Sequence, residues 1–385
     1  MTTDQAAAWL QSYLSGRRQS YFTDGHLSDP MDLPDCGVPQ GSIGGPLLWI
    51  CFTCDQPDVV HDHPVDGEDP GRGCSADRHD EQEVGGGHGH GVDGKDCGEL
   101  VGYVDDGVYS YAHVDPAVVS EVLTDKYLKL EDWMNGNKLV VNPDKTHLMV
   151  MGSRKTAGKR KEVSMKAGSF IIKPTKTEKL LGGQISQDLQ WNQHIRDHES
   201  SLMRQLTSRI NGLKKTARNA TFTTRLMVAN GIVMSKLIYL ITLWGGAQQY
   251  LLKALLVQQL LAARVVCGFQ CLGWTKRKIL DSVGWLSVLQ LIFFHTILQA
   301  HKTITSGVPR PLHAAISTDH PCRTRRAANG LIRFGETFSG GSDSFKYRAM
   351  TWYNMVPFSV RQGSITTVKR KMKQWVRLNV PIDWG

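Results

Sequence analysis

Apolar and polar residues recur along this chain with spacings that predict a mixture of helices and strands. Two stretches, 6–14 and 116–135, carry apolar residues three and four positions apart, which predicts an amphipathic helix in each. Shorter apolar runs predict strands at 100–103, 107–109, 139–141, 147–151, 169–172 and 179–185.

The pattern becomes helical from residue 191 to about 306. One predicted helix carries an apolar stripe of Leu202, Leu206, Ile210 and Leu213. Ser287 is in position to cap another helix, which runs to residue 301. The segment 226–244 is very apolar but is interrupted by polar residues and Gly231, so it predicts a buried helix rather than a membrane span.

Residues 53–99 break this pattern, because they contain no Leu, Ile, Met, Phe, Tyr or Trp. Such a composition buries too little apolar surface to offset the entropy of ordering, so we predict a disordered insert. Charge divides at the same place. The chain has a formal net charge of +9, and residues 51–99 hold 13 Asp or Glu and 3 Lys or Arg, a net of −10 that leaves +19 elsewhere. The basic remainder favours a polyanionic partner, whereas the insert would repel a phosphate backbone.

Eight Cys residues without a signal pattern predict reduced thiols in an intracellular protein, in the nucleus or cytoplasm, and we expect no membrane segment. Cys51 and Cys54 form a Cys-x-x-Cys pair, and the insert adds Cys74, Cys97 and five His. A second Cys pair is missing. Adventitious metal binding by the His-rich tract is therefore favoured over a structural zinc site.

The most specific local feature is the adjacent pair Asp105 and Asp106, between two short apolar runs that predict a hairpin. Two carboxylates held at an exposed tip repel each other unless a cation neutralises them, and hard oxygen ligands favour Mg²⁺. Asp is also a common turn residue, so the pair alone is equally well explained as an ordinary turn.

Four sequence blocks occur in an order that resembles the reverse transcriptases of non-LTR (LINE-type) retrotransposons. They are Gly37-Val38-Pro39-Gln40-Gly41-Ser42, Tyr103-Val104-Asp105-Asp106, Asn142-Pro143-Asp144-Lys145 and Leu180-Leu181-Gly182-Gly183. The resemblance implies an α+β fold, with a partial right-hand polymerase palm, an antiparallel sheet with helices, followed by a helical thumb and a basic C-terminal region. It divides the chain into palm (1–52), insert (53–99), palm (100–190), thumb (191–306) and basic region (307–385).

The resemblance also implies an RNA-directed DNA polymerase, a nucleotidyltransferase that uses two Mg²⁺ ions, an RNA template, a DNA primer and deoxynucleoside triphosphates. Asp105 and Asp106 would ligate the ions, and Lys145 would stabilise charge near the triphosphate. Gly37, Pro39, Gln40, Gly41 and Ser42 would contact template and nucleotide. Leu181, Gly182 and Gly183 would grip the primer end. From the residues alone, Lys145 is equally well a solvated turn lysine, and 181–183 a strand with a bulge.

One part of the family pattern is missing. The family has a further metal-binding aspartate in a Phe-x-Asp-x-x-x-Ala-Phe block, which this sequence does not contain; Asp4 lies in no matching context. We therefore expect a truncated domain that is inactive alone. The alternative is a non-catalytic remnant that binds nucleic acid through its basic thumb and tail, and a third is a translated fossil without a role.

Overall fold

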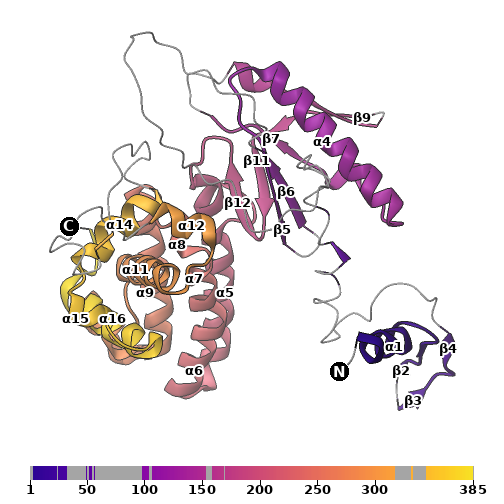
Figure 1. The fold of residues 1–385 in the computed structure, drawn as a ribbon. Coiled ribbons are helices and arrows are strands. Elements are labelled where there is room, and N and C mark those ends of the chain that lie inside the picture. The colour runs from indigo at the N-terminus through magenta and orange to yellow at the C-terminus, as the bar shows by residue number, and fades with distance from the viewer. Residues whose placement is uncertain are drawn as a thin grey trace, which may run out of the picture. The chain divides into compact units, whose positions relative to one another are not determined.

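The computed structural model describes residues 3–23, 25–32, 49, 52–53, 56, 98–103, 106–152, 158–168, 170–316, 331–332 and 344–384 (Figure 1). The chain divides into two compact units: unit 1 comprises residues 1–148 and 157–174, and unit 2 comprises 149–156 and 175–385. Helices and two-stranded antiparallel sheets make up the described residues, which confirms the α+β class in its coarse form. The polymerase palm and the fivefold division of the chain stay predictions.

Unit 1 opens with α1 (Thr3–Leu14), the helix predicted for 6–14. Two short strand pairs follow, β1 (Arg18–Gln19) with β4 (Met31–Asp32) and β2 (Phe22–Thr23) with β3 (His26–Leu27). The Nε of Arg18 donates to a carboxylate oxygen of Asp32 at 2.8 Å across the outer pair. Both side chains are exposed, so this ion pair adds little stability.

The predicted hairpin around the paired aspartates is present. Strands β5 (Glu99–Tyr103) and β6 (Asp106–Ser110) are antiparallel, with Leu100 opposite Tyr109 and Tyr103 opposite Asp106. The hairpin is largely exposed on both faces.

The predicted helix at 116–135 is α4 (Pro116–Gly136). Pro116 occupies its first turn and the Asp115 side chain accepts from the Ala117 amide, which satisfies a helix-end donor. The helix packs on β8 (Met165–Ala167). The hydroxyls of Ser120 and Thr124 accept from the amides of Ser164 and Lys166, each at 3.2 Å. Two hydroxyls one helical turn apart thus satisfy donors along this strand.

The remaining elements up to residue 175 are short. They are the 3₁₀ turns η1 (Pro143–Lys145) and η3 (Lys159–Lys161) and the strands β7 (Leu148–Met149), β9 (Phe170–Ile172), which pairs with β8, and β10 (Pro174–Thr175). The strand predicted at 139–141 was wrong. Lys138 has a φ of 60° just after α4, Val140 is 89% exposed, and among the described strands none pairs with residues 139–141.

Unit 2 begins with the hairpin β11 (Thr177–Leu180) and β12 (Gly183–Ser186). The single strand predicted for 179–185 was therefore wrong. The φ angles of Leu181 and Gly182 are 46° and 80°, and two successive positive values reverse the chain in a two-residue turn. A π-helical turn, η4 (Gln193–Asp197), then leads to α5 (Leu202–Thr216). The predicted stripe on α5 is confirmed, since Leu202, Leu206, Ile210 and Leu213 are all buried.

The apolar stretch 226–244 is buried in part, as expected, but it is not one helix. It contains the end of α6 (Phe222–Ala229), a π-helical turn η6 (Asn230–Met234), α7 (Ser235–Ile238) and α8 (Ile241–Trp244). Leu240 has a φ of 57°, which interrupts the helix between α7 and α8.

Helix α9 (Gln249–Cys267) is the one helix among the described residues with the length and apolar composition to cross a membrane. Ten of its residues, including Leu255 and Leu260, are buried within unit 2. A helix buried in the core of a folded unit can have the same length and apolar composition, so α9 is weak evidence for a membrane span. After it come a 3₁₀ turn, η7 (Gly268–Cys271), and α10 (Lys276–Ser282).

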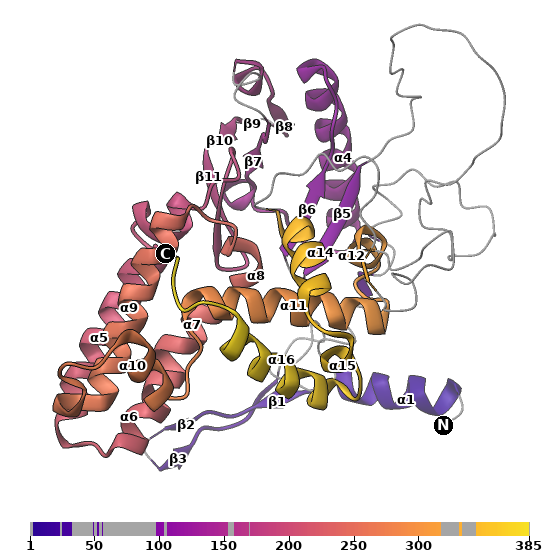
Figure 2. The same ribbon diagram turned by 90° about the vertical axis from the view of Figure 1, so that its left-hand side faces the viewer.

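Helix α11 (Val288–Ser306) packs against helices from both sides of it in the sequence (Figure 2). Earlier in the chain these are α8 and α9, and later they are α12 (Arg310–Ala315), α14 (Phe345–Met355) and α16 (Ile365–Asn379); α15 (Phe358–Arg361) packs on α16. Phe293 on α11 stacks on Trp352 of α14, with ring centroids 4.8 Å apart. Helices on either side of residue 307 therefore share one core.

The Ser287 cap predicted for α11 is confirmed. Its hydroxyl accepts from the Gln290 amide, and the Gln290 side chain accepts from the Ser287 amide.

We expect Ser287→Ala to lower the free energy of unfolding by about 1–2 kcal/mol, because a buried helix-end donor loses its partner. Urea unfolding followed by circular dichroism measures this. Ser208→Ala, at an exposed position on α5, is the matched control and should be nearly neutral; equal losses in both variants would contradict the assignment.

Candidate nucleic-acid interface

Asp106 is the one member of the aspartate pair that the structure describes. It is exposed and begins β6, opposite Tyr103. Asp105 lies outside the described residues, as do Gly37, Pro39, Gln40, Gly41 and Ser42. The Cys and His residues weighed as a zinc site (Cys51, Cys54, Cys74, Cys97 and the five His of the insert) also lie outside them.

Asp106 alone does not test the expected Mg²⁺ site, because its neighbour Asp105 lies outside the described residues. The hairpin contributes one described carboxylate, and within the described part of the chain no group of three His, Cys, Asp or Glu side chains is close enough together to hold a metal. A hard divalent cation takes several oxygen ligands, so the expected Mg²⁺ site stays a prediction.

Lys145 is exposed at the end of the 3₁₀ turn η1. The Asn142 side chain accepts from the Asp144 amide at 3.0 Å and so shapes this turn. No hydrogen bond or ion pair joins Lys145 to Asp106, both of which the structure describes. Its expected role beside a triphosphate stays a prediction.

Leu181 and Gly182 form the two-residue turn of the β11–β12 hairpin, and Gly183 is the first residue of β12, opposite Leu180, so this segment is not a bulged strand. The Tyr239 hydroxyl donates to the Leu181 carbonyl. A Cβ on Gly182 would lie 3.3 Å from the Tyr239 ring, and one on Gly183 would lie 2.8 Å from the Leu240 side chain. The turn is therefore packed closely against the break between α7 and α8, and a side chain at 183 would displace the end of the Leu240 side chain.

A buried histidine supports the same hairpin. The Nδ1 atom of His194, on η4, accepts from the Gln184 amide of β12 at 3.2 Å, which requires an unprotonated nitrogen there. Burial, and then the charge of Lys236, lower the pKa of His194 from 6.5 to about 4. His194 is thus neutral at pH 7.

The exposed face of α5 and the preceding η4 form an open groove of about 790 Å³, called here the α5 groove. It is lined by Arg196, Met203, Arg204, Thr207, Ser208, Asn211, Gly212 and Lys215. The α5 members recur three and four residues apart, on the face opposite the buried stripe. Cations stand at both ends, while small and polar side chains line the middle.

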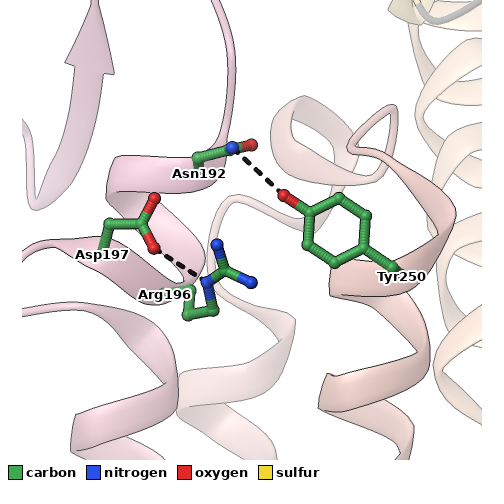
Figure 3. Close-up of polar contacts among 4 residues, drawn as sticks. All are labelled: Asn192, Arg196, Asp197 and Tyr250. Atoms are coloured by element: carbon green, nitrogen blue, oxygen red, sulfur yellow. Dashed lines mark hydrogen bonds and ion pairs between the residues drawn. The ribbon is translucent and has the colours of Figure 1, made fainter.

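Arg196 is held at one end of the groove by two neighbours (Figure 3). Its Nε donates to an Asp197 carboxylate oxygen at 2.8 Å, and its guanidinium carbon lies 5.3 Å from the centre of the Tyr250 ring. The Tyr250 hydroxyl in turn accepts from the Asn192 side chain at 3.1 Å. The carboxylate of Asp197 offsets part of the Arg196 charge, so Arg204 and Lys215 supply most of the positive field in the groove.

Comparisons with protein-family models, with curated proteins and with solved structures find no match.

Sequence reasoning missed several residues of this interface. Tyr239 was hidden within a stretch predicted as one continuous helix, and its partner Leu181 is 58 positions away. Asn192, Arg196 and Tyr250 come together only through the fold. The spacing of Arg204, Asn211 and Lys215 opposite an apolar stripe was visible in the sequence and could have located the groove.

The low pKa of His194 makes the stability of unit 2 depend on pH. The unfolded chain binds a proton as pH falls below 6.5 while folded His194 does not, so we expect the free energy of unfolding to fall between pH 6.5 and 4. His194→Asn keeps an acceptor for the Gln184 amide but does not titrate, so its melting temperature should fall less steeply across this window. Thermal melts at a series of pH values test this, with His198→Asn as the control for loss of a histidine. Equal slopes for wild type and His194→Asn would refute the assignment.

Proposed function

We propose that this chain binds a duplex of RNA template and DNA primer, as the palm and thumb part of a reverse transcriptase of the non-LTR retrotransposon type, and that it does not extend the primer by itself. The observation that carries the binding is the α5 groove, with its cations at both ends. The polymerase assignment is supported by the four sequence blocks in the family's order.

The charge of unit 2 supports a polyanionic ligand. Its described residues from 175 onward contain 25 Lys or Arg and 6 Asp or Glu, a net formal charge of +19. A surface of this sign attracts phosphates, and binding releases the counterions of the nucleic acid.

The distribution of side chains within the groove suits a duplex. Arg204 and Lys215 are eleven residues apart, about 16 Å along a helix, and can contact phosphates. Thr207, Ser208 and Asn211 lie between them and offer hydroxyl and amide groups of a size that can approach sugars and base edges.

The expected inactivity toward deoxynucleoside triphosphates rests on the ligand set that the resemblance implies. Two-metal phosphoryl transfer needs several carboxylates to hold both ions, and this sequence lacks the block that supplies the family's further aspartate. The second candidate is a non-catalytic remnant that binds nucleic acid, and the same groove favours it. It differs from the first only in that the chain is not part of a working polymerase.

We expect the double variant Arg204→Gln, Lys215→Gln to weaken binding of an RNA–DNA duplex and to reduce the slope of log affinity against log salt by about two, because two phosphate contacts are lost. Filter binding between 50 and 300 mM salt, roughly the range in which such contacts are sensitive, measures both. The matched control is Lys253→Gln, Arg277→Gln, which removes the same charge from exposed positions outside the groove. Equal weakening in both variants would mean that the groove has no special role.

We expect no primer extension by the chain alone with Mg²⁺ or Mn²⁺, on a duplex that it binds. Gel analysis of a labelled primer with all four deoxynucleoside triphosphates tests this, and an active reverse transcriptase on the same duplex is the positive control. Template-dependent synthesis that Asp106→Asn abolishes would contradict the expected inactivity and would establish the enzyme.

A further inference from the structure

The two ends of the α5 groove differ in chemistry. Arg196 of η4 and Met203, in the first turn of α5, line one end, and η4 packs on α5. Lys215, in the last turn of α5, lines the other end. The end with Arg196 and Met203 is called here the Arg196 end. A planar guanidinium and a thioether line the groove there, beside the charge of Arg204.

The guanidinium of Arg196 is held as a flat surface (Figure 3). Its carbon lies over the Tyr250 ring, 5.3 Å from the ring centre, and its Nε donates to Asp197 at 2.8 Å. The Asn192 amide donates to the Tyr250 hydroxyl at 3.1 Å and so fixes the ring in turn. About half of the Arg196 side chain (52%) is exposed. An oriented planar group is therefore accessible to a ligand in the groove.

The charge at this end favours an uncharged ligand. The Asp197 carboxylate is paired with Arg196 and is itself partly exposed, with 36% of its side chain accessible. A phosphate placed beside Arg196 would meet this second negative charge and be repelled, whereas an uncharged ring would not. Arg204 and Lys215, which also line the groove, have no carboxylate partner among the printed ion pairs of the described residues. Phosphates are thus expected at these two cations, and a planar uncharged group at Arg196.

A nucleic-acid base has the properties that this end selects. Bases stack on guanidinium planes and on aromatic rings, and a polarisable thioether such as that of Met203 packs well against a ring. Arg204 follows Met203 directly and can contact the phosphate of the same nucleotide. A base within a duplex is already covered on both faces by its neighbours. The ligand of the Arg196 end must therefore be unpaired.

We infer that the Arg196 end of the α5 groove is a stacking site for one unpaired base next to the bound duplex. The duplex rests on the proposed function, whereas the affinity for an unpaired base does not. Arg196 contacts the base on its flat face, and Met203 packs against it. Tyr250 is a positioning residue that holds the guanidinium plane.

Duplexes with a base or an abasic overhang test the site. An RNA–DNA duplex carries one unpaired nucleotide at either end in turn, and in the matched ligand that nucleotide lacks its base. Both ligands have the same phosphates, so the ratio of their affinities reports the base alone. Fluorescence anisotropy of labelled duplexes should give the wild type a preference of about tenfold for the base-containing overhang.

Arg196→Lys keeps the charge of the site and removes its plane, so the preference should fall to about one. Tyr250→Leu should have the same effect, and Tyr250→Phe, which keeps the ring, should retain most of the preference. Arg277→Lys, at an exposed position on α10 outside the groove, is the matched control and should keep all of it. Each ratio is measured within one variant, so a loss of stability affects both ligands equally. A lower melting temperature for Arg196→Lys with an unchanged preference would mean that Arg196 only fastens η4 to α9, and would overturn the site.

A short single strand tests the site without a duplex. Oligoadenylate of about four nucleotides should bind the wild type, and Arg196→Lys should weaken this binding by about tenfold. Free adenosine at the same concentration should compete poorly, because it lacks the phosphate that Arg204 contacts. Displacement of the oligoadenylate by adenosine would identify a site for a free nucleoside and overturn the assignment to a strand.

The outcomes separate this inference from the proposed function. A chain that binds oligoadenylate through Arg196 but binds no duplex retains the stacking site and overturns the proposed function. A chain that binds duplexes with base and abasic overhangs equally well overturns the stacking site alone. A chain that binds neither duplex nor oligoadenylate overturns both.

Discussion

The burial of α11 on several sides is the constraint on which the rest of unit 2 depends. Its apolar residues contact α8 and α9, which precede it, and α14 and α16, which follow it. Its first turn is closed by the Ser287–Gln290 pair, and Gln290 also donates to the Val380 carbonyl at 2.9 Å, just beyond α16. His301 near the other end hydrogen-bonds the Tyr353 hydroxyl of α14 at 3.1 Å. Aromatic stacking in the middle and polar contacts toward both ends thus fix the later helices on one shared core.

Most charges of unit 2 lie at the surface of this apolar core, although Arg348 and Arg361 are buried. Helix α5 shows the result most clearly, with four buried aliphatic residues on one side and the cations of the groove on the other. With few acids available, some cations are held by uncharged neighbours, as Arg209 is by the Ile232 carbonyl at 2.8 Å. Such contacts orient a cation without cancelling its field, which leaves the surface available to an anion.

The sequence predicted the periodic helices well, but it did not predict the breaks in the chain at Leu181 and Leu240. The helices at 6–14 and 116–135, the stripe on α5 and the Ser287 cap were all correct, because each depends on local spacing and helix-end chemistry. The errors at 179–185 and 226–244 share one cause. Leu181 and Leu240 adopt left-handed backbone angles that Leu rarely takes, and no local pattern indicates that long-range packing will impose them. The aspartate hairpin was predictable because local apolar spacing marks both of its strands. Tyr239 beside the 181–183 turn was not, because its contact with Leu181 joins residues 58 positions apart.

The shared core also sets an order of events during synthesis. Helix α9 emerges from the ribosome well before α16, and α11 lies between them in the sequence. Until α14 and α16 have been made, the face of α11 that carries Phe293 has no cover and remains exposed to water. Unit 2 therefore cannot bury this face of α11 until the last part of the core, α14 and α16, has been made.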